Sequence, residues 1–287
     1  MAEIISGKIV SEKIRKEIKS DVEKFIIKTG HIPGLSVILV GNDPASGVYV
    51  RNKHKACLEV GINSFEVKFP EDIEEETLIE KIRELNFDDS VDGILVQLPL
   101  PRHINEDRVI NSISPSKDVD AFHPSNVGGI MIGKYSFLPC TPAGIIALLD
   151  HYNVSIAGKR CVVIGRSNIV GKPMAMLLLE RNGTVTVCHS KTIGLKEITL
   201  VADIVVVAIG RANFLTADMI KPGAVVIDVG INRTDDGKLC GDVLFDDVSL
   251  VASKITPVPG GVGPMTITML LKNTISAAKL NYEKNIK

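Results

Sequence analysis

The spacing of apolar residues divides the first half of the chain into alternating strands and helices. After Ser11, apolar residues recur at helical spacing from Ile14 to Ile26, and Gly30 is placed to end this helix. Three β-rich runs then alternate with two helical patterns. The predicted strands are 35–40, 62–69 and 91–98, and the predicted helices are 49–60 and 77–85. This alternation predicts a parallel sheet with crossover helices.

The second half of the chain begins after a Pro-containing break at residues 138–142, where we place the domain junction. A helical pattern from Ala143 to Tyr152 leads to four apolar runs that are typical of buried strands. These runs are 160–165, 184–189, 203–210 and 224–230. Together they predict a Rossmann-type domain, and the last helical pattern, 265–280, is expected to pack back on the first domain.

The predicted fold class is therefore α/β, with two domains that are each a mostly parallel sheet with flanking helices. The length of 287 residues fits two such domains better than one. The first domain is expected to span residues 1–140, with the C-terminal helix 265–287 packed on it, and the second to span residues 141–264.

Composition and charge favour a globular protein with small-molecule partners. Hydrophobic residues make up 45% of the chain, and 33 Lys and Arg residues nearly balance 34 Asp and Glu residues. This balance offers no global attraction for nucleic acid or an anionic membrane surface. No apolar run approaches the roughly 20 residues that span a bilayer. Met1 opens onto a sequence without the basic and apolar regions of a secretory signal, so we expect the cytoplasm.

The cysteines and histidines indicate neither a disulfide framework nor a metal site. The five cysteines are odd in number, widely spaced and without a C-x-x-C pair. The six histidines show no ligand spacing, so no metal is expected. His123 is interpreted as a loop or capping residue.

A glycine turn joins the predicted strand 160–165 to the helical run that follows. It extends from Gly165-Arg166-Ser167 to Gly171, and such a turn offers backbone N–H groups and a helix dipole to a pyrophosphate. The glycine spacing differs from the standard dinucleotide fingerprint, so an ordinary strand-to-helix turn stays the alternative. The position of the turn in a four-strand unit favours dinucleotide binding.

The end of the next predicted strand bears on the choice between NAD and NADP. An NAD site usually has Asp or Glu there, to accept hydrogen bonds from the ribose 2′-hydroxyl. This chain has His189-Ser190-Lys191, and a hydroxyl beside cations suits a 2′-phosphate, with Arg166 as a further cation. NADP is therefore the expected cofactor. In the alternative interpretation, Arg166 and Lys191 are solvated surface cations.

Candidate chemistry in the first half begins with Tyr49 and Lys53, which are four residues apart and share a helix face. A lysine in a partly desolvated cleft can have its pKa lowered enough for proton transfer. The alternative is an ordinary solvated helix lysine. Gln97 lies at the carboxyl end of a buried strand, where open α/β sheets bind ligands, although it could equally cap the turn.

Two further segments are candidates for ligand contact. Asp118 and Asp120 are spaced to point the same way if their segment is extended, and one of them is expected to be structural. The segment Pro259 to Thr266 is dense in glycine, which suggests backbone that approaches a ligand closely. A tight turn and helix cap is the alternative for this second segment.

Together these segments resemble the bifunctional methylenetetrahydrofolate dehydrogenase/cyclohydrolase family over nearly the whole chain. The matching motifs occur in the family's order: Tyr49 with Lys53, Gln97-Leu98-Pro99, Lys117-Asp118-Val119-Asp120, Pro139-Cys140-Thr141-Pro142, Gly165-Arg166-Ser167 through Pro173, and Pro259 through Thr266. The Gln-Leu-Pro and Pro-Gly-Gly-Val-Gly-Pro motifs are specific.

The resemblance implies oxidation of 5,10-methylenetetrahydrofolate by NADP to the methenyl compound, and its hydrolysis to 10-formyltetrahydrofolate in the same interdomain cleft. It implies one-carbon metabolism that includes purine biosynthesis. Its expected partners are tetrahydrofolate one-carbon derivatives and a second copy of the chain, in a homodimer assembled mainly through the cofactor domain.

The resemblance also implies residue roles. Lys53 is the expected main proton-transfer residue, Tyr49 packs on and hydrogen-bonds the folate, and Gln97 positions or tunes Lys53. Asp120 is expected to hold the pterin and completes this catalytic set. The other expected folate contacts are Leu98, Pro99, Pro259, Gly260 and Gly261. The expected NADP contacts are Gly165, Arg166, Ser167, Ser190 and Ile231.

One position departs from the family pattern, because Ala121 stands where the family commonly has Gly. A methyl group there is expected to shift the pterin loop slightly without loss of activity. Since the sequence ends at Lys287, the synthetase domain of some eukaryotic relatives and its ATP-dependent formylation are not expected. Two rival interpretations are a shikimate-dehydrogenase-like enzyme, which Gln97-Leu98-Pro99 disfavours, and a non-catalytic NADP-sensing module, which Tyr49 with Lys53 disfavours.

Overall fold

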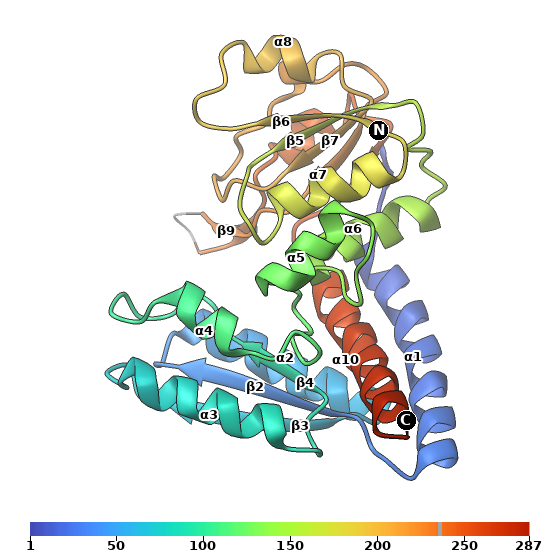
Figure 1. The fold of residues 1–287 in the computed structure, drawn as a ribbon. Coiled ribbons are helices and arrows are strands. Elements are labelled where there is room, and N and C mark those ends of the chain that lie inside the picture. The colour runs from blue at the N-terminus through green and yellow to red at the C-terminus, as the bar shows by residue number, and fades with distance from the viewer. Residues whose placement is uncertain (235–236, 287) are drawn as a thin grey trace. The chain divides into compact units, whose positions relative to one another are not determined.

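The computed structural model describes residues 1–234 and 237–286 (Figure 1). The chain forms two compact units that interleave in sequence. Unit 1 comprises Met1–Glu12 and Thr141–Thr266, and unit 2 comprises Lys13–Cys140 and Ile267–Lys287. The sequence analysis placed residues 1–12 in the first domain. In the structure they group instead with the second half of the chain.

Unit 2 is built on a three-stranded parallel sheet, which confirms the sheet type predicted for the first half. The strand order is β3-β2-β4. The strands are β2 (Gly34–Val40), β3 (Asn63–Phe69) and β4 (Gly93–Val96). The crossover helices are α2 (Pro44–Val60) and α3 (Glu75–Phe87). Helix α2 begins five residues before the predicted helix, because Asp43 caps it by accepting a hydrogen bond from the Ser46 backbone N–H at 2.7 Å.

The apolar periodicity of these elements closes one core of unit 2. All seven residues of β2 are buried, as expected for the central strand of a parallel sheet covered on both faces. The core joins strand residues to α3 and to helix α4 (Glu106–Ser112). Its members include Ile38, Val40, Leu78, Ile82, Ile94, Val96 and Val109. This core fixes the carboxyl end of β4, where Gln97 follows.

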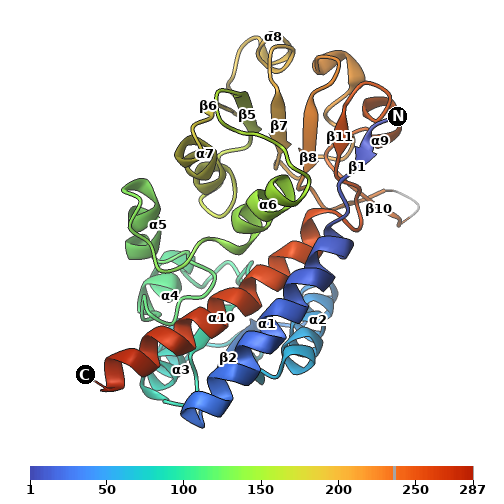
Figure 2. The same cartoon turned by 90° about the vertical axis from the view of Figure 1, so that its right-hand side faces the viewer.

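Most of two long helices, from residue 13 in the first and from residue 267 in the second, belongs to unit 2 and completes it. Helix α1 (Gly7–Thr29) and helix α10 (Val262–Ile286) lie side by side there (Figure 2). Arg15 Nε donates to Thr268 Oγ1 at 3.1 Å, and the rings of Phe25 and Tyr282 meet edge to face. Helix α5 (Pro124–Met131) comes after α4 in the chain and is separated from it by the turn that contains Asp118 and Asp120.

Unit 1 is built on a six-stranded sheet with the order β1-β11-β8-β7-β5-β6, in which all pairs are parallel. The strands are β1 (Glu3–Ile4), β5 (Arg160–Ile164), β6 (Thr184–Cys188), β7 (Ile204–Val207), β8 (Val225–Asp228) and β11 (Lys254–Ile255). The chain runs from β5 out to β6 and then returns to β7 on the other side of β5. This reversal is the topology predicted for a Rossmann-type domain.

The two shortest strands explain the unexpected place of the N-terminus. Strand β1 pairs in register with β11, Glu3 opposite Lys254 and Ile4 opposite Ile255. Two-residue strands have no periodicity of their own, so the sequence pattern did not indicate them. Tyr152 adds a second contact, since its hydroxyl accepts a hydrogen bond from the Ser6 backbone N–H at 2.9 Å.

The remaining elements of unit 1 flank this sheet. They are α6 (Cys140–His151), α7 (Gly171–Glu180), α8 (Leu195–Thr199), the 3₁₀ turn η1 (Ala217–Met219), α9 (Phe245–Val248) and the hairpin of β9 (Asn232–Arg233) and β10 (Leu239–Cys240). Among the described residues, no helix is both long enough and apolar enough to cross a membrane.

Candidate active site and cofactor site

Lys53 and Gln97 form the centre of the candidate active site in unit 2. Lys53 lies on α2 and is only 8% exposed. Gln97 directly follows β4, where its backbone N–H bonds the Ile38 carbonyl and extends the sheet by one residue. The Lys53 Nζ donates a hydrogen bond to the Gln97 Oε1 at 2.9 Å, and the Gln97 Nε2 donates to the Leu98 carbonyl at 2.8 Å. The second bond fixes the amide so that its oxygen faces the lysine.

Burial determines the protonation behaviour of Lys53. Desolvation lowers the pKa of Lys53, and the negative charge of Asp120 opposes this shift. Burial also raises the pKa of the Asp120 carboxyl, while Lys53 acts to lower it. Tyr49 is half-buried on the same helix as Lys53, and burial raises the pKa of its hydroxyl. A lysine with a lowered pKa beside a carboxyl group is suited to proton transfer.

The segment that bears Asp118 and Asp120 is a turn, so the extended conformation on which their expected common direction depended is not present. Asp118 is 2% exposed and accepts hydrogen bonds from the His123 backbone N–H and the Asn126 Nδ2, both at 2.8 Å. Its role is therefore to hold the turn. His123 accepts a hydrogen bond from the Ser125 backbone N–H at its Nδ1 and caps α5, which confirms its interpretation as a capping residue.

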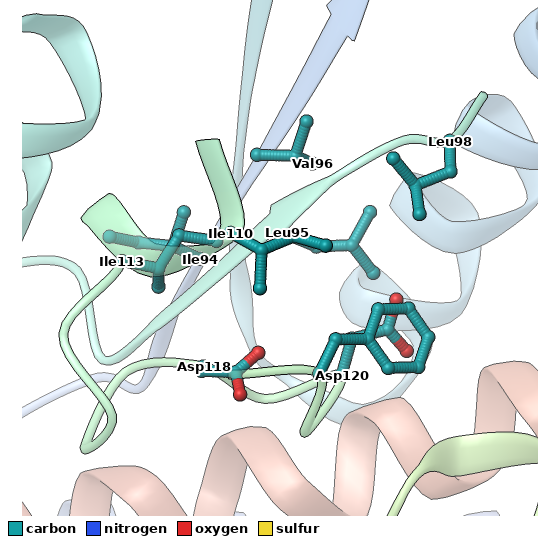
Figure 3. A pocket seen from close by; sticks show the side chains of 9 residues that line it. Ile94, Leu95, Val96, Leu98, Ile110, Ile113, Asp118 and Asp120 are labelled. Carbon is teal, nitrogen blue, oxygen red and sulfur yellow. The ribbon is translucent and has the colours of Figure 1, made fainter. Parts of the chain in front are cut away.

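A small cavity lies beside this turn (Figure 3). Its volume is about 10 Å³, which is room for one water molecule at most. Apolar side chains of β4, Leu98, Ile110, Ile113 and Phe122 line it together with the two aspartates. The cavity is too small for a folate, but it places both carboxyl groups against apolar surface. That placement is the desolvation that raises the pKa of Asp118 and of Asp120.

Two residues that the sequence did not single out for chemistry complete this site. The Asn273 Nδ2 on α10 donates to the Val119 carbonyl at 2.8 Å and to the Leu138 carbonyl at 2.9 Å. Cys140 is buried beside Asp120, and burial with this carboxyl raises the pKa of its thiol well above the usual range. Asn273 thus holds the peptide between Asp118 and Asp120 in place.

The glycine turn of unit 1 is shaped by close backbone packing. Gly165 has φ +125°, and a Cβ atom there would collide with the Ala208 carbonyl. A Cβ atom at Gly171 would collide with the Gly165 carbonyl. The Ser167 Oγ accepts hydrogen bonds from the Val170 and Gly171 backbone N–H groups at 3.2 and 3.3 Å. The turn therefore feeds directly into the N-terminus of α7, where a phosphate is favourably bound.

The ends of β5 and β6 lie together in the sheet, because Ile164 is in register with Cys188. Arg166 follows β5, and Ser190 and Lys191 follow β6, and all three are exposed. Two cations and a hydroxyl group therefore follow the carboxyl ends of two adjacent strands, and together they provide hydrogen-bond donors for a phosphate.

Both halves of the chain match models of one protein family. Residues 5–120 match the catalytic domain of tetrahydrofolate dehydrogenase/cyclohydrolase, and residues 139–282 match its NAD(P)-binding domain. The chain belongs to the tetrahydrofolate dehydrogenase/cyclohydrolase family. This finding confirms the resemblance seen in the sequence.

Individual members of the tetrahydrofolate dehydrogenase/cyclohydrolase family match almost end to end. The bifunctional protein FolD of Acetivibrio thermocellus is 62% identical over 280 residues, which cover 97% of this chain and 98% of the relative. The crystal structure of the Campylobacter jejuni FolD methylenetetrahydrofolate dehydrogenase/cyclohydrolase has a TM-score of 0.95 at 52% identity, and the match covers 98% and 100% of the two chains. The Trypanosoma brucei enzyme, solved with NADP cofactor and inhibitor, has a TM-score of 0.94 at 40% identity and 98% coverage of both chains.

The glycine-rich segment that this family shares has a packing reason for its glycines. The Gly260 carbonyl accepts a hydrogen bond from the Lys8 backbone N–H at 3.2 Å, and a Cβ atom at Gly7 would collide with the Gly261 carbonyl. Pro259, Gly260 and Gly261 belong to unit 1, whereas Lys53, Gln97 and Asp120 belong to unit 2. Ile231 follows β8 in unit 1 and is 48% exposed.

Proposed function

We infer that the chain is a bifunctional one-carbon folate enzyme. It oxidises 5,10-methylenetetrahydrofolate to 5,10-methenyltetrahydrofolate with NADP, and it hydrolyses the methenyl compound to 10-formyltetrahydrofolate. The family match over both halves supports the two activities. Within the chain itself, the observation that supports them best is the hydrogen bond between the buried Lys53 and Gln97.

The hydrolysis is the step that needs a proton-transfer group, and we assign that role to Lys53. Water adds to the methenyl carbon, and one of its protons passes to the neutral amine of Lys53. Ring opening then breaks the bond from this carbon to N5, N5 takes up a proton, and the hydroxyl proton leaves as the formyl C=O forms. The net products are 10-formyltetrahydrofolate and one proton. The lowered pKa of Lys53 supports this role, because a larger fraction of the amine is neutral at a given pH.

The other folate residues are assigned to binding and positioning. Gln97 holds the Lys53 amine in one place, and Asp120 binds polar groups of the pterin. Tyr49, Leu98 and Pro99 contact the folate, and so does the backbone of Pro259, Gly260 and Gly261. Hydride transfer depends mainly on the alignment of the two rings and not on a group that transfers a proton. These binding contacts therefore matter most for the dehydrogenase.

We assign NADP to the strand ends of unit 1. Gly165, Arg166 and Ser167 are placed to bind phosphate at the N-terminus of α7, and Ser190 is placed to bind the 2′-phosphate. Ile231 contacts the cofactor at the end of β8. When bound, NADP supplies the acceptor for the hydride that leaves the methylene carbon.

A spectrophotometric assay tests the function. Purified protein with methylenetetrahydrofolate and NADP is expected to form NADPH, and protein with methenyltetrahydrofolate is expected to accelerate its hydrolysis above the buffer rate. Absence of both activities from folded protein would overturn the assignment.

We also propose a homodimer that forms through unit 1. Strand β6 is at the edge of the six-stranded sheet and pairs only with β5 among the described residues. Its side chain Val187 is 38% exposed and the nearby Ile193 is 94% exposed. An open edge with exposed apolar residues is suited to pairing with a second copy about a two-fold axis. Sedimentation at micromolar concentration is expected to give a dimer, and a monomer would contradict this proposal.

The cytoplasm is the proposed compartment, and purine biosynthesis is a proposed use of the 10-formyl product. Cys57, Cys140, Cys161, Cys188 and Cys240 are all free thiols, as is usual for proteins of a reducing compartment. Fractionation of the source cell tests the location. Growth of a strain that lacks the gene, with and without added purine, tests the use of the product.

A further inference from the structure

Two buried aspartates in unit 1 are left unexplained by the reaction chemistry. Asp228 ends β8 and is 2% exposed, and Asp242 is 0% exposed. Buried carboxyl groups are costly unless hydrogen bonds satisfy them. The bonds of these two side chains connect the turns that follow β7 and β8.

Asp242 collects the N–H donors of both turns. Its Oδ2 accepts from the backbone N–H groups of Ile209 and Gly210 at 2.7 and 3.1 Å, and its Oδ1 accepts from the Arg211 backbone N–H at 2.8 Å. These three residues follow β7. The Oδ1 also accepts from the Asn232 Nδ2 at 2.9 Å, after β8. One carboxylate therefore fixes two neighbouring strand ends.

Asp228 holds the segment that bears Asp242. Its carboxylate accepts hydrogen bonds from the backbone N–H groups of Asp242 and Val243, at 2.9 and 3.0 Å. Each of the two carboxylates occupies the position that a side chain would take at a nearby glycine, Gly230 or Gly241. A Cβ atom at Gly230 would overlap the Asp242 carboxylate, and a Cβ atom at Gly241 would overlap the Asp228 carboxylate. The arrangement thus admits only glycine at both positions.

The strand order places these turns at one half of the cofactor site. Strands β5 and β6 carry the residues assigned to phosphate and to the 2′-phosphate, which is the adenosine half. Strands β7 and β8 lie on the other side of β5, and in a Rossmann-type sheet the second half of the dinucleotide binds there. Ile231 is assigned to NADP and lies between Gly230 and Asn232. The Asn232 Nδ2 donates to the Asp242 carboxylate, and the missing side chain of Gly230 leaves room for that carboxylate.

We propose that Asp242 is a positioning residue for the nicotinamide half of NADP, acting through the turns at Ile209–Arg211 and Gly230–Asn232. This proposal rests on the proposed function. Asp242 need not touch the cofactor, because it holds the backbone turns at which the nicotinamide half would bind. Misplacement of a reacting ring by about 1 Å can cost on the order of 10²-fold in rate.

The test compares two halves of the cofactor in the full-length protein. Asp242→Asn keeps the shape of the side chain but replaces one acceptor oxygen by a donor, and Asp242→Ala removes both oxygens. Binding of 2′,5′-ADP, which lacks the nicotinamide, is measured by calorimetry. The dehydrogenase kcat at saturating NADP and folate and the cyclohydrolase rate without NADP are measured beside it. Asp247→Asn, an exposed position five residues along the chain, is the matched control.

The expected result is a selective loss. The dehydrogenase kcat of the Asp242 variants falls about 10- to 100-fold, whereas 2′,5′-ADP affinity and the cyclohydrolase rate stay within about 3-fold of wild type, a change worth well under 1 kcal/mol. Asp247→Asn behaves as wild type. Unchanged kcat overturns the proposal, and so does a variant that is unfolded by circular dichroism or loses 2′,5′-ADP binding equally, since the role is then structural. Failure of the proposed function is distinguishable, because wild-type protein would then lack both activities.

Discussion

The Nζ of Lys53 donates a hydrogen bond to the Oε1 of Gln97 over 2.9 Å, while the other end of the Gln97 amide is held by the Leu98 carbonyl. The lysine therefore faces a neutral acceptor with a fixed orientation. An amide oxygen stabilises the ammonium form less than a carboxylate would. Gln97 thus lets burial keep the pKa of Lys53 below its ordinary value.

Gln97→Glu is expected to move the pH dependence of the cyclohydrolase upward. The neutral amine is the active form, so the rate rises as Lys53 loses its proton. A carboxylate at hydrogen-bond distance favours the ammonium and raises the pKa of Lys53, which shifts the rising limb up by about 1 to 3 pH units. Gln97→Met removes the acceptor without adding charge, so its limb is expected to shift down. The cyclohydrolase rate of both variants is measured from pH 5 to 10. If the rising limbs of the two variants shifted in the same direction, this role of Gln97 would be refuted.

Lys53 also links stability to pH. Because its pKa is lower in the folded protein than in the unfolded chain, the unfolded chain binds more protons between the two pKa values. The contribution of Lys53 to the free energy of unfolding therefore increases with pH across that window. Urea unfolding of wild type and Lys53→Met at several pH values isolates this contribution. This contribution is expected to vanish in the variant. If the free energy of unfolding rose equally with pH in both proteins, the result would contradict the buried environment of Lys53.

Ala121 is expected to tolerate glycine but not a β-branched side chain. It is fully buried at φ +60°, in the left-handed region, which costs an L residue roughly 1 to 2 kcal/mol. Ala121→Gly removes this strain, but it also removes a buried methyl group and adds unfolded-state entropy, about 0.8 and 0.4 to 1 kcal/mol. These opposing effects leave the stability within about 1 kcal/mol of wild type. Ala121→Val is expected to lose more than about 2 kcal/mol. Equal midpoints in urea for both variants would argue against the strained turn.

Asn273→Leu is expected to weaken folate binding without affecting the cofactor site. The substitution keeps the size of the side chain but leaves the Val119 and Leu138 carbonyls without their amide donor. An unsatisfied buried group costs roughly 1 to 3 kcal/mol, so the turn that bears Asp120 becomes less ordered. The KM for methylenetetrahydrofolate is expected to rise about 5- to 100-fold, with little change in the KM for NADP. Lys272→Ala, an exposed neighbour, is the control. A parallel rise of both KM values would point to general destabilisation.

Arg166→Ala is expected to reduce the preference for NADP over NAD. Arg166 and Lys191 are exposed at adjacent strand ends, and one charge-assisted phosphate contact contributes roughly 1.5 to 3 kcal/mol. The kcat/KM for NADP should therefore fall about 10- to 100-fold, while that for NAD changes little. Lys159→Ala removes an exposed cation next to the opposite end of β5 and is expected to have no effect. Equal or better use of NAD by wild type would contradict the assignment of the 2′-phosphate site.

The sequence pattern was sufficient for elements that carry their own periodicity. The buried run of β2 and the repeated apolar positions of α3 predicted both elements within a few residues. The pairing of β1 with β11 was not predictable, because these two-residue strands are fixed by contacts between residues 251 positions apart in the sequence. For this reason the sequence did not predict that residues 1–12 group with the second half of the chain.

The candidate site divides in the same way. Lys53 and Gln97 were indicated by helix spacing and by position after a strand, and the family motif joined them. Asn273 and Asp242 act through bonds to backbone atoms far away in sequence, so local spacing contained no signal for the contacts they make. The Gly-Asp-Val sequence at 241–243 was the available hint for Asp242, since its glycine admits no side chain.

The most direct measurement follows the two reactions separately in Lys53→Met. Methionine keeps most of the apolar stem, so the fold is expected to survive, as circular dichroism can verify. Loss of a general acid or base typically costs about 10² to 10⁴ in rate, so hydrolysis of methenyltetrahydrofolate should fall by that factor. NADPH formation should fall less, because hydride transfer depends mainly on ring alignment. Hydrolysis by the folded variant at the wild-type rate would contradict proton transfer by Lys53.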